Sequence, residues 1–192
     1  MKRALLLAML LAAVASVQAA DLAKPLILVA APEMHDPVYG KTVIVVAPVG
    51  GDQHIGFIVN RPSDTTLGKI FPEDGPSQKV HDPVYLGGPY QPQLVFALVA
   101  RAKNPGGKSL ELMPGLYAAA DAPTVDTIIR GDAAKARFVA GLVAWQPGEL
   151  SEEIKARAWY VLEPDARVVL RKPADNLWEE LVRRSQAAAN AI

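Results

Sequence analysis

Three short apolar runs near the beginning of the chain constrain the fold more than any other feature. They span residues 25–31 (PLILVAA), 42–47 (TVIVVA) and 55–59 (IGFIV), and turn-forming residues follow each of them. Runs of this length, rich in Leu, Ile and Val, are typical of strands buried on both faces. Because only short turn-forming segments join them, we expect an antiparallel meander at the centre of the fold.

The rest of the chain mixes further strands with helices. Additional strands are predicted over residues 84–86, 93–101, 109–119 and 137–145, and a hairpin is predicted from residues 159–162 and 167–170. Helices are predicted over residues 65–71, 121–129, 147–157 and 176–189. No alternation of strand and helix carries a glycine fingerprint, so the pattern favours an α+β fold over a dinucleotide-binding one.

The first 19 residues have the features of a secretory signal peptide. Lys2 and Arg3 form a basic start, residues 4–15 are uninterruptedly apolar, and Val17-Gln18-Ala19 is a small-x-small cleavage pattern. The alternative is an uncleaved anchor, but the apolar run is shorter than the ~20 residues that a membrane span needs. We therefore expect a mature single domain over residues 20–192, located in the periplasm or secreted, with no stable membrane span after cleavage.

The charge balance argues against nucleic-acid binding. Removal of the signal peptide leaves 18 basic against 20 acidic residues, a net charge of −2, and no run of basic residues remains. Proteins that bind nucleic acids neutralise phosphates with clustered Lys and Arg. The chain also has no cysteine, which removes thiol nucleophiles and zinc–thiolate sites from consideration.

Two corners at strand ends are the candidate ligand-binding surface. Asn60-Arg61-Pro62 follows the third buried run, and Gly87-Gly88-Pro89 follows the run at 84–86. Arginine suits bidentate recognition of carboxylate or phosphate, and glycine permits close backbone approach. The proposed set is Asp36, Asn60, Arg61, Gly87 and Gly88. The structural alternative is that Asn60 satisfies backbone groups of a turn while Arg61 pairs with Asp36 or Asp64.

A five-residue repeat offers a second candidate. His35-Asp36-Pro37-Val38-Tyr39 recurs as His81-Asp82-Pro83-Val84-Tyr85, and two His-Asp pairs have the donors for one metal ion. The structural alternative is that Asp-Pro forms a turn and Val-Tyr begins a strand, so that the repeat binds no metal. No serine lies in a Gly-x-Ser-x-Gly elbow, and we assign no catalytic residue, metal site or cofactor.

Several segments in order resemble the YqgE/AlgH family of bacterial proteins. They are HDPVYGKTV, GFIVNRPSDTTL, VYLGGPYQP and AWQPGELSEEIKARAWYVL, within residues 25–180. The positions that match the family pattern are Met34, Asp36, Pro37, Gly56, Asn60, Arg61, Pro62, Tyr85, Gly87, Gly88, Pro89, Trp145, Gly148, Leu150, Glu153 and Trp159. Ala144 and Glu149 depart from it, as does the export signal. The resemblance implies an α+β fold with a mostly antiparallel, barrel-like sheet flanked by helices.

These observations lead to one functional hypothesis and two alternatives. We expect a non-enzymatic, exported binding or interaction protein whose ligand or protein partner the sequence does not specify. One alternative is a transcriptional regulator, which is the label that the family carries. The other is a metal-assisted hydrolase that uses His35, Asp36, His81 and Asp82.

Overall fold

The computed structural model describes residues 21–190, so the predicted signal peptide lies outside the described residues. Within 21–190, no helix is long and apolar enough to cross a membrane. The described chain contains ten strands: β1 (Leu26–Ala30), β2 (Val43–Gly50), β3 (Gln53–Ile58), β4 (Pro62–Thr66), β5 (Pro83–Leu86), β6 (Tyr90–Ala100), β7 (Ser109–Met113), β8 (Leu116–Ala119), β9 (Ala136–Trp145) and β10 (Trp159–Leu162). Its helices are α1 (Leu67–Ile70), η1 (Ser77–Lys79), α2 (Ala122–Asp132), η2 (Ala133–Lys135), α3 (Glu149–Lys155), α4 (Ala166–Val169) and α5 (Leu177–Asn190).

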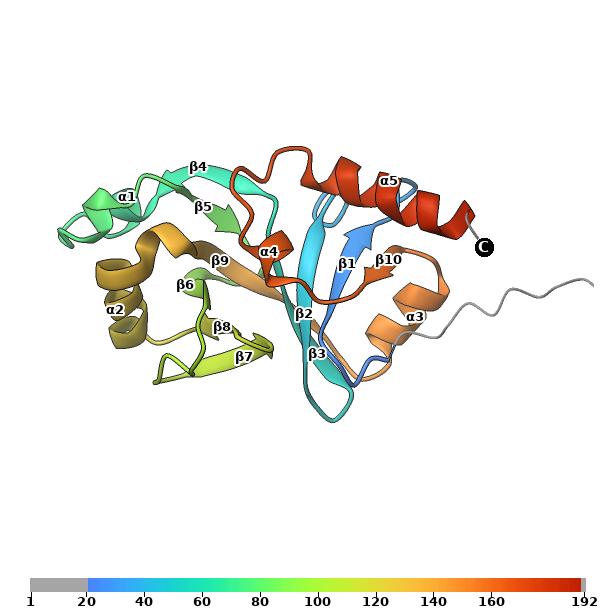
Figure 1. The fold of residues 1–192 in the computed structure, drawn as a ribbon, viewed down its shortest axis with the longest axis horizontal. Helices are drawn as coiled ribbons and strands as arrows, with labels where there is room; N and C mark the ends of the chain where they lie inside the picture. Colours follow the sequence, from blue (N-terminus) through green and yellow to red (C-terminus); the bar gives the residue numbers. More distant parts are fainter. Residues whose placement is uncertain (1–20, 191–192) are drawn as a thin grey trace, which may run out of the picture.

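The strands form one curled sheet in the order β10-β1-β2-β3-β9-β6-β8-β7, with β4 and β5 attached beside β9. The predicted meander is confirmed: β1 pairs antiparallel with β2, and β2 pairs antiparallel with β3. Every pair is antiparallel except β5 with β9. Figure 1 shows α5 and α3 near the β1–β10 edge and α2 at the other end of the molecule. This is the α+β, mostly antiparallel fold predicted from the sequence.

Strand β9 joins the two halves of the sheet, because it pairs with β3, β5 and β6. Its first half pairs with β6 on one side and with β5 on the other, while its last residues pair with β3. Most of its side chains are buried, because β9 contributes residues to the clusters of apolar side chains that pack against the sheet. Because β9 runs directly into α3, the end of this strand also positions the helix that lines the pocket described below.

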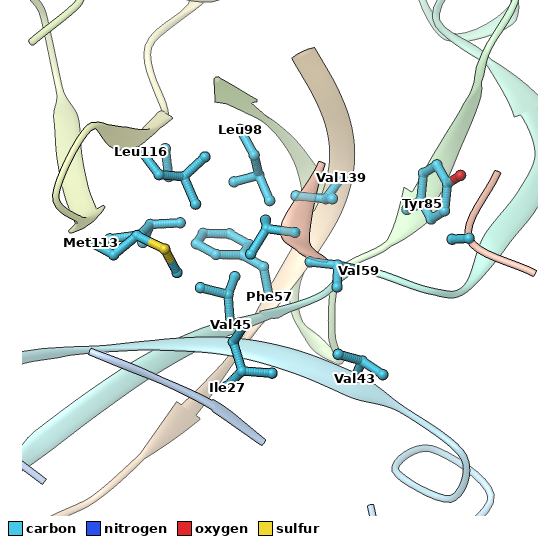
Figure 2. Close-up of a cluster of buried hydrophobic side chains, with 14 of the residues drawn as sticks. Ile27, Val43, Val45, Phe57, Val59, Tyr85, Leu98, Met113, Leu116 and Val139 are labelled. Atoms are coloured by element: carbon cyan, nitrogen blue, oxygen red, sulfur yellow. The ribbon is translucent and has the colours of Figure 1, made fainter. Parts of the chain in front are cut away.

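The main core lies inside the curl of the sheet. Ile27, Val45 and Phe57 from the meander meet Leu98 and Leu116 from the other half, and all five are at most 1% exposed. Figure 2 shows these side chains converging from both halves of the sheet. Burial of a Leu, Ile, Val or Phe side chain contributes about 1.5–3 kcal/mol to folding. The apolar runs identified in the sequence therefore supply the residues that join the two halves.

Helix α2 begins as its sequence predicts. The Asp121 carboxylate accepts a hydrogen bond from the Thr124 backbone N–H at 3.1 Å, and Pro123 lies in the first turn. Helix α5, predicted over residues 176–189, buries Leu177, Leu181 and Val182 on one face.

Two local predictions are wrong. Residues 62–66 form strand β4, which pairs with β5, so only 67–70 of the predicted helix over 65–71 are helical. Residues 166–169 form helix α4 and not the second strand of a hairpin. The Asp165 carboxylate accepts a hydrogen bond from the Arg167 backbone N–H and caps that helix. Both local sequences are compatible with helix and with strand. Pairing with β5 makes residues 62–66 a strand, and capping by Asp165 makes residues 166–169 a helix.

Candidate functional site

The side chain of Asn60 is occupied by the loop before β2. Its Oδ1 accepts a hydrogen bond from the Val43 backbone N–H at 2.8 Å, and its Nδ2 donates to the Lys41 carbonyl at 2.9 Å. An amide that satisfies one donor and one acceptor of the same loop fixes that loop against the end of β3. This arrangement agrees with the structural account of Asn60.

Arg61 holds the same loop from a second point. Its guanidinium donates hydrogen bonds to the carbonyls of Val38 at 2.6 Å and Gly40 at 3.2 Å. Within residues 21–190 it forms no ion pair, so the predicted pairing with Asp36 or Asp64 is wrong. Arg61 binds the carbonyls of Val38 and Gly40 instead, because the loop before β2 lies against the residues that follow β3.

The two glycines lie where backbones approach closely. A Cβ on Gly87 would lie 2.4 Å from the Gly141 carbonyl oxygen, and one on Gly88 would lie 2.3 Å from the Leu142 carbonyl. The Gly87 N–H donates to Ala140, and its carbonyl accepts from the Ile58 N–H, both at 2.8 Å. Gly87 therefore bridges β3 and β9 at a point where a side chain would not fit.

The loop at residues 36–43 joins Asp36 to Asn60 and Arg61, and the backbone of Arg61 contacts the segment that leads to Gly87. The Asp36 carboxylate accepts hydrogen bonds from the N–H groups of Val38 and Tyr39, at 2.7 and 2.8 Å. Arg61 binds the same loop, and its own carbonyl accepts from the Leu86 N–H at 2.8 Å, next to Gly87. We call this cluster, Asp36 with Asn60, Arg61, Gly87 and Gly88, the Asn60 corner. Its polar groups are engaged within the chain, and ligand binding there stays a prediction.

The two His-Asp turns do not form a metal site. Within residues 21–190, no group of three or more His, Cys, Asp or Glu side chains has positions that could hold a metal ion. Asp36 caps its own turn, whereas the Asp82 carboxylate pairs with Lys172 at 2.6 Å. Because the metal hypothesis required the two turns to share an ion, the geometry removes its basis.

A pocket of about 600 Å³ lies at a different place, where β9 runs into α3. We call it the tryptophan pocket. Its lining residues come from the β1–β2 loop, the end of β9, α3 and the first residue of β10: Tyr39, Val143, Ala144, Trp145, Pro147, Gly148, Glu149, Glu152, Glu153 and Trp159. Pockets of ~300–1,000 Å³ with aromatic walls and a few polar groups are typical ligand sites.

The turn between β9 and α3 depends on Gly148. This residue has a φ of 87°, a left-handed conformation that favours glycine, and its N–H donates to the Asp52 carboxylate at 2.9 Å. The helix then places Glu149 and Glu153 four residues apart, on the same face. The local sequence thus directs two carboxylates toward one side of the helix.

Two indoles hold the carboxylate of Glu153. Its Oε2 accepts hydrogen bonds from the Nε1–H groups of Trp145 at 3.0 Å and Trp159 at 2.7 Å. The two tryptophans are 4% and 6% exposed, so both pack in the core and also line the pocket. A carboxylate fixed by two buried donors is pre-organised without needing a charged partner.

Tyr39 closes the pocket from the β1–β2 loop. Its ring meets that of Trp159 edge to face, with the centroids 6.4 Å apart. Burial raises the pKa of the Tyr39 hydroxyl, and the negative charges of Glu153, Asp36 and Glu149 raise it further. The tyrosine therefore lies in a region of negative potential.

Sequence reasoning did not assign Tyr39, Glu153 and Trp159 to a site. Glu153 and Trp159 were noted only as positions that match the family pattern. A signal was present in the acidic helix between two tryptophans, since indole N–H groups and carboxylates are complementary. The contribution of Tyr39 depends on the fold, because more than 100 residues separate it from α3.

The curled antiparallel sheet with flanking helices, and the pocket at the β9–α3 junction, define a single-domain α+β protein with an acidic, aromatic cavity. The family model described as AlgH-like matches residues 27–190. The chain therefore belongs to the AlgH-like family, which confirms the resemblance seen in the sequence.

Similar proteins cover most of the chain. A UPF0301 protein of Paraburkholderia phymatum is 29% identical over 158 residues, which are 79% of this chain and 82% of that protein. A UPF0301 protein of Myxococcus xanthus is 28% identical over 163 residues, covering 83% and 88%. Among solved structures, AlgH of Pseudomonas aeruginosa has 25% identity and a TM-score of 0.68, with 88% and 87% of the two chains covered. Protein DIP2367 of Corynebacterium diphtheriae, at 24% identity and a TM-score of 0.69 over 84% and 86%, shares the fold.

Proposed function

We propose that this protein is an exported, non-enzymatic binding protein and that the tryptophan pocket is its ligand site. One observation carries the proposal: the Glu153 carboxylate is fixed by Trp145 and Trp159 on the wall of a pocket of about 600 Å³. Specific binding sites combine an apolar wall with a few polar groups held in place before the ligand arrives.

The Asn60 corner supports this site indirectly. Asn60 and Arg61 hold the loop that carries Tyr39, one of the aromatic residues that line the pocket. The polar groups at the corner are already paired, whereas the pocket offers space beside a fixed carboxylate. We therefore assign ligand contact to the pocket and loop support to the corner.

Tryptophan fluorescence and thermal stability together test the ligand site. Two of the three tryptophans line the pocket, so a bound ligand is expected to change the intrinsic emission and raise the melting temperature. A panel of small amines, carboxylates, sugars and nucleotides would be screened at millimolar concentration. Ala144→Leu fills the pocket from an exposed strand position, and Ala100→Leu, at the exposed end of β6, is the matched control.

Compounds that bind the wild type and Ala100→Leu but not Ala144→Leu would support the proposal. Two results would reject the proposal. Either no compound binds the wild type, or every compound that binds the wild type binds Ala144→Leu with the same affinity. Export is tested separately by fractionating cells that express the full chain, where cytoplasmic recovery of the uncleaved form would contradict it.

A further inference from the structure

The charged residues that line the tryptophan pocket are all acidic. Three of its ten lining residues are glutamates, and none is Lys, Arg or His. Glu152 forms an exposed ion pair with Lys155, with Nζ and Oε1 2.7 Å apart. Within the described part of the chain, neither Glu149 nor Glu153 has a cationic partner, although Oε2 of Glu149 accepts a hydrogen bond from the Gln146 backbone N–H at 2.7 Å. The lining of the pocket is therefore acidic.

One oxygen of Glu153 is free to contact a ligand. Both indole N–H groups donate to Oε2, and Oε1 accepts no hydrogen bond from any residue in 21–190. Oε1 is also not among the buried polar atoms without a partner in this part of the chain, so it is accessible, and Glu153 lines the pocket. A carboxylate oxygen offers only acceptor capacity, and it forms its strongest hydrogen bonds with charged N–H donors.

The aromatic wall favours an alkyl group next to the charged one. Tyr39, Trp145 and Trp159 line the pocket beside Glu153. Aromatic side chains supply apolar contact surface at ligand sites, beside a few polar groups that fix the orientation of the ligand. A metal ion is a poorer fit, because no set of three ligating side chains in residues 21–190 is arranged to hold one. The volume instead suits an organic molecule of several heavy atoms.

We propose that the tryptophan pocket binds a small organic cation with N–H donors, an alkylammonium or alkylguanidinium group, which hydrogen-bonds to Oε1 of Glu153 and lies against the aromatic wall. This inference rests on the proposed function, since it names the ligand class of the same pocket. The raised pKa of Tyr39, discussed above, agrees with a negative potential in this place.

Four probes with the same six-carbon chain separate charge from shape. They are hexylammonium, trimethylhexylammonium, hexan-1-ol and hexanoate, titrated at low ionic strength and followed by tryptophan fluorescence. We expect hexylammonium to bind the wild type at least about tenfold more tightly than the alcohol or the carboxylate. It should also bind more tightly than the trimethyl analogue, which has no N–H donor.

Three glutamine substitutions identify the carboxylate. Glu153→Gln keeps an acceptor for the two indoles but removes the charge, and we expect hexylammonium affinity to fall roughly tenfold to hundredfold. Glu149→Gln leaves the indole hydrogen bonds intact and should weaken binding by a factor of roughly three. Glu180→Gln, which lies on α5 outside the pocket and removes a charge paired with Arg171, is the matched control and should stay within about twofold. Melting temperatures check that each variant is folded.

The outcomes distinguish the two proposals. If hexanol or hexanoate binds as tightly as hexylammonium and Ala144→Leu abolishes that binding, the pocket is the site but its cation preference is wrong. Unchanged hexylammonium affinity in both Glu153→Gln and Glu149→Gln would also overturn the cation inference. Equal affinity for the trimethyl analogue would overturn the N–H contact to Oε1. If the binding of no probe depends on Ala144, the proposed function fails as well.

Discussion

The guanidinium of Arg137 lies 3.9 Å from the centre of the Tyr85 ring, and both side chains are buried. Nε of Arg137 donates a hydrogen bond to the Val169 carbonyl at 2.8 Å, and Nη2 donates to the Arg171 carbonyl. No carboxylate within residues 21–190 forms an ion pair with this arginine. Burial lowers its pKa, which the nearby Tyr85 and Asp82 partly oppose. The cation thus ties α4 and the segment after it to β9.

Arg137→Ala is expected to lower the free energy of unfolding by about 3–5 kcal/mol, because it leaves a cavity and removes the donors to two carbonyls. Chemical denaturation followed by circular dichroism measures the change. Arg130→Ala, which removes two exposed ion pairs, with Asp126 and Asp74, is the control and should have a much smaller effect. A loss as small as that of the control would show that the buried contacts of Arg137 contribute little.

Arg61→Ala is expected to lower the free energy of unfolding by about 1–3 kcal/mol, because two backbone carbonyls lose a charged donor. Arg61→Lys should lose less, since lysine keeps the charge and can still donate to a carbonyl. Thermal denaturation and ligand titration would be measured on the same samples. Unchanged stability with complete loss of ligand binding would instead assign ligand contact to the Asn60 corner.

Gly87→Ala is expected to lower the free energy of unfolding by about 3 kcal/mol or more, because the new Cβ would clash with backbone atoms that cannot move independently. Gly131→Ala is the matched control. This glycine lies within α2 with open space where the Cβ would be, so alanine should stabilise the protein by up to about 1 kcal/mol. If Gly87→Ala changed the free energy of unfolding no more than Gly131→Ala does, the close approach of Gly87 to β9 would be contradicted.

Low pH is expected to reduce the contribution of the Asp121 carboxylate to the stability of the folded protein. Hydrogen bonds from the Lys108 backbone N–H, and from Thr124, lower the pKa of this carboxyl from its ordinary value of 3.8. Because the folded pKa is the lower one, the stabilisation is present above the ordinary value and is lost as the pH falls through the folded value. Asp121→Asn keeps a cap that does not titrate. The stability of the wild type relative to this variant should therefore decline below about pH 4, and a constant difference would contradict the assignment.

Element type followed from local pattern wherever that pattern was strong. The runs of Leu, Ile and Val predicted β1, β2 and β3, and the range 121–129 predicted most of α2, since burial on both faces and capping act over a few residues. Residues 65–71 and 167–170 were assigned wrongly for the same reason. Their sequences allow both helix and strand, and pairing of β4 with β5 and capping by Asp165 decided between them.

The sequence by itself determined the family, the α+β class and most of the strands, because these depend on short apolar runs and turn residues. Only the tertiary structure decided what the polar residues do. The sequence allows two roles for Asn60 and Arg61, a binding corner or support of a turn, and their hydrogen bonds to the loop before β2 agree with the second. The tryptophan pocket requires β10 to pair with β1, Ala30 opposite Trp159, which carries Trp159 to the end of β9 and to α3. Contacts between residues so distant in the chain depend on strand pairing, which no local pattern specifies.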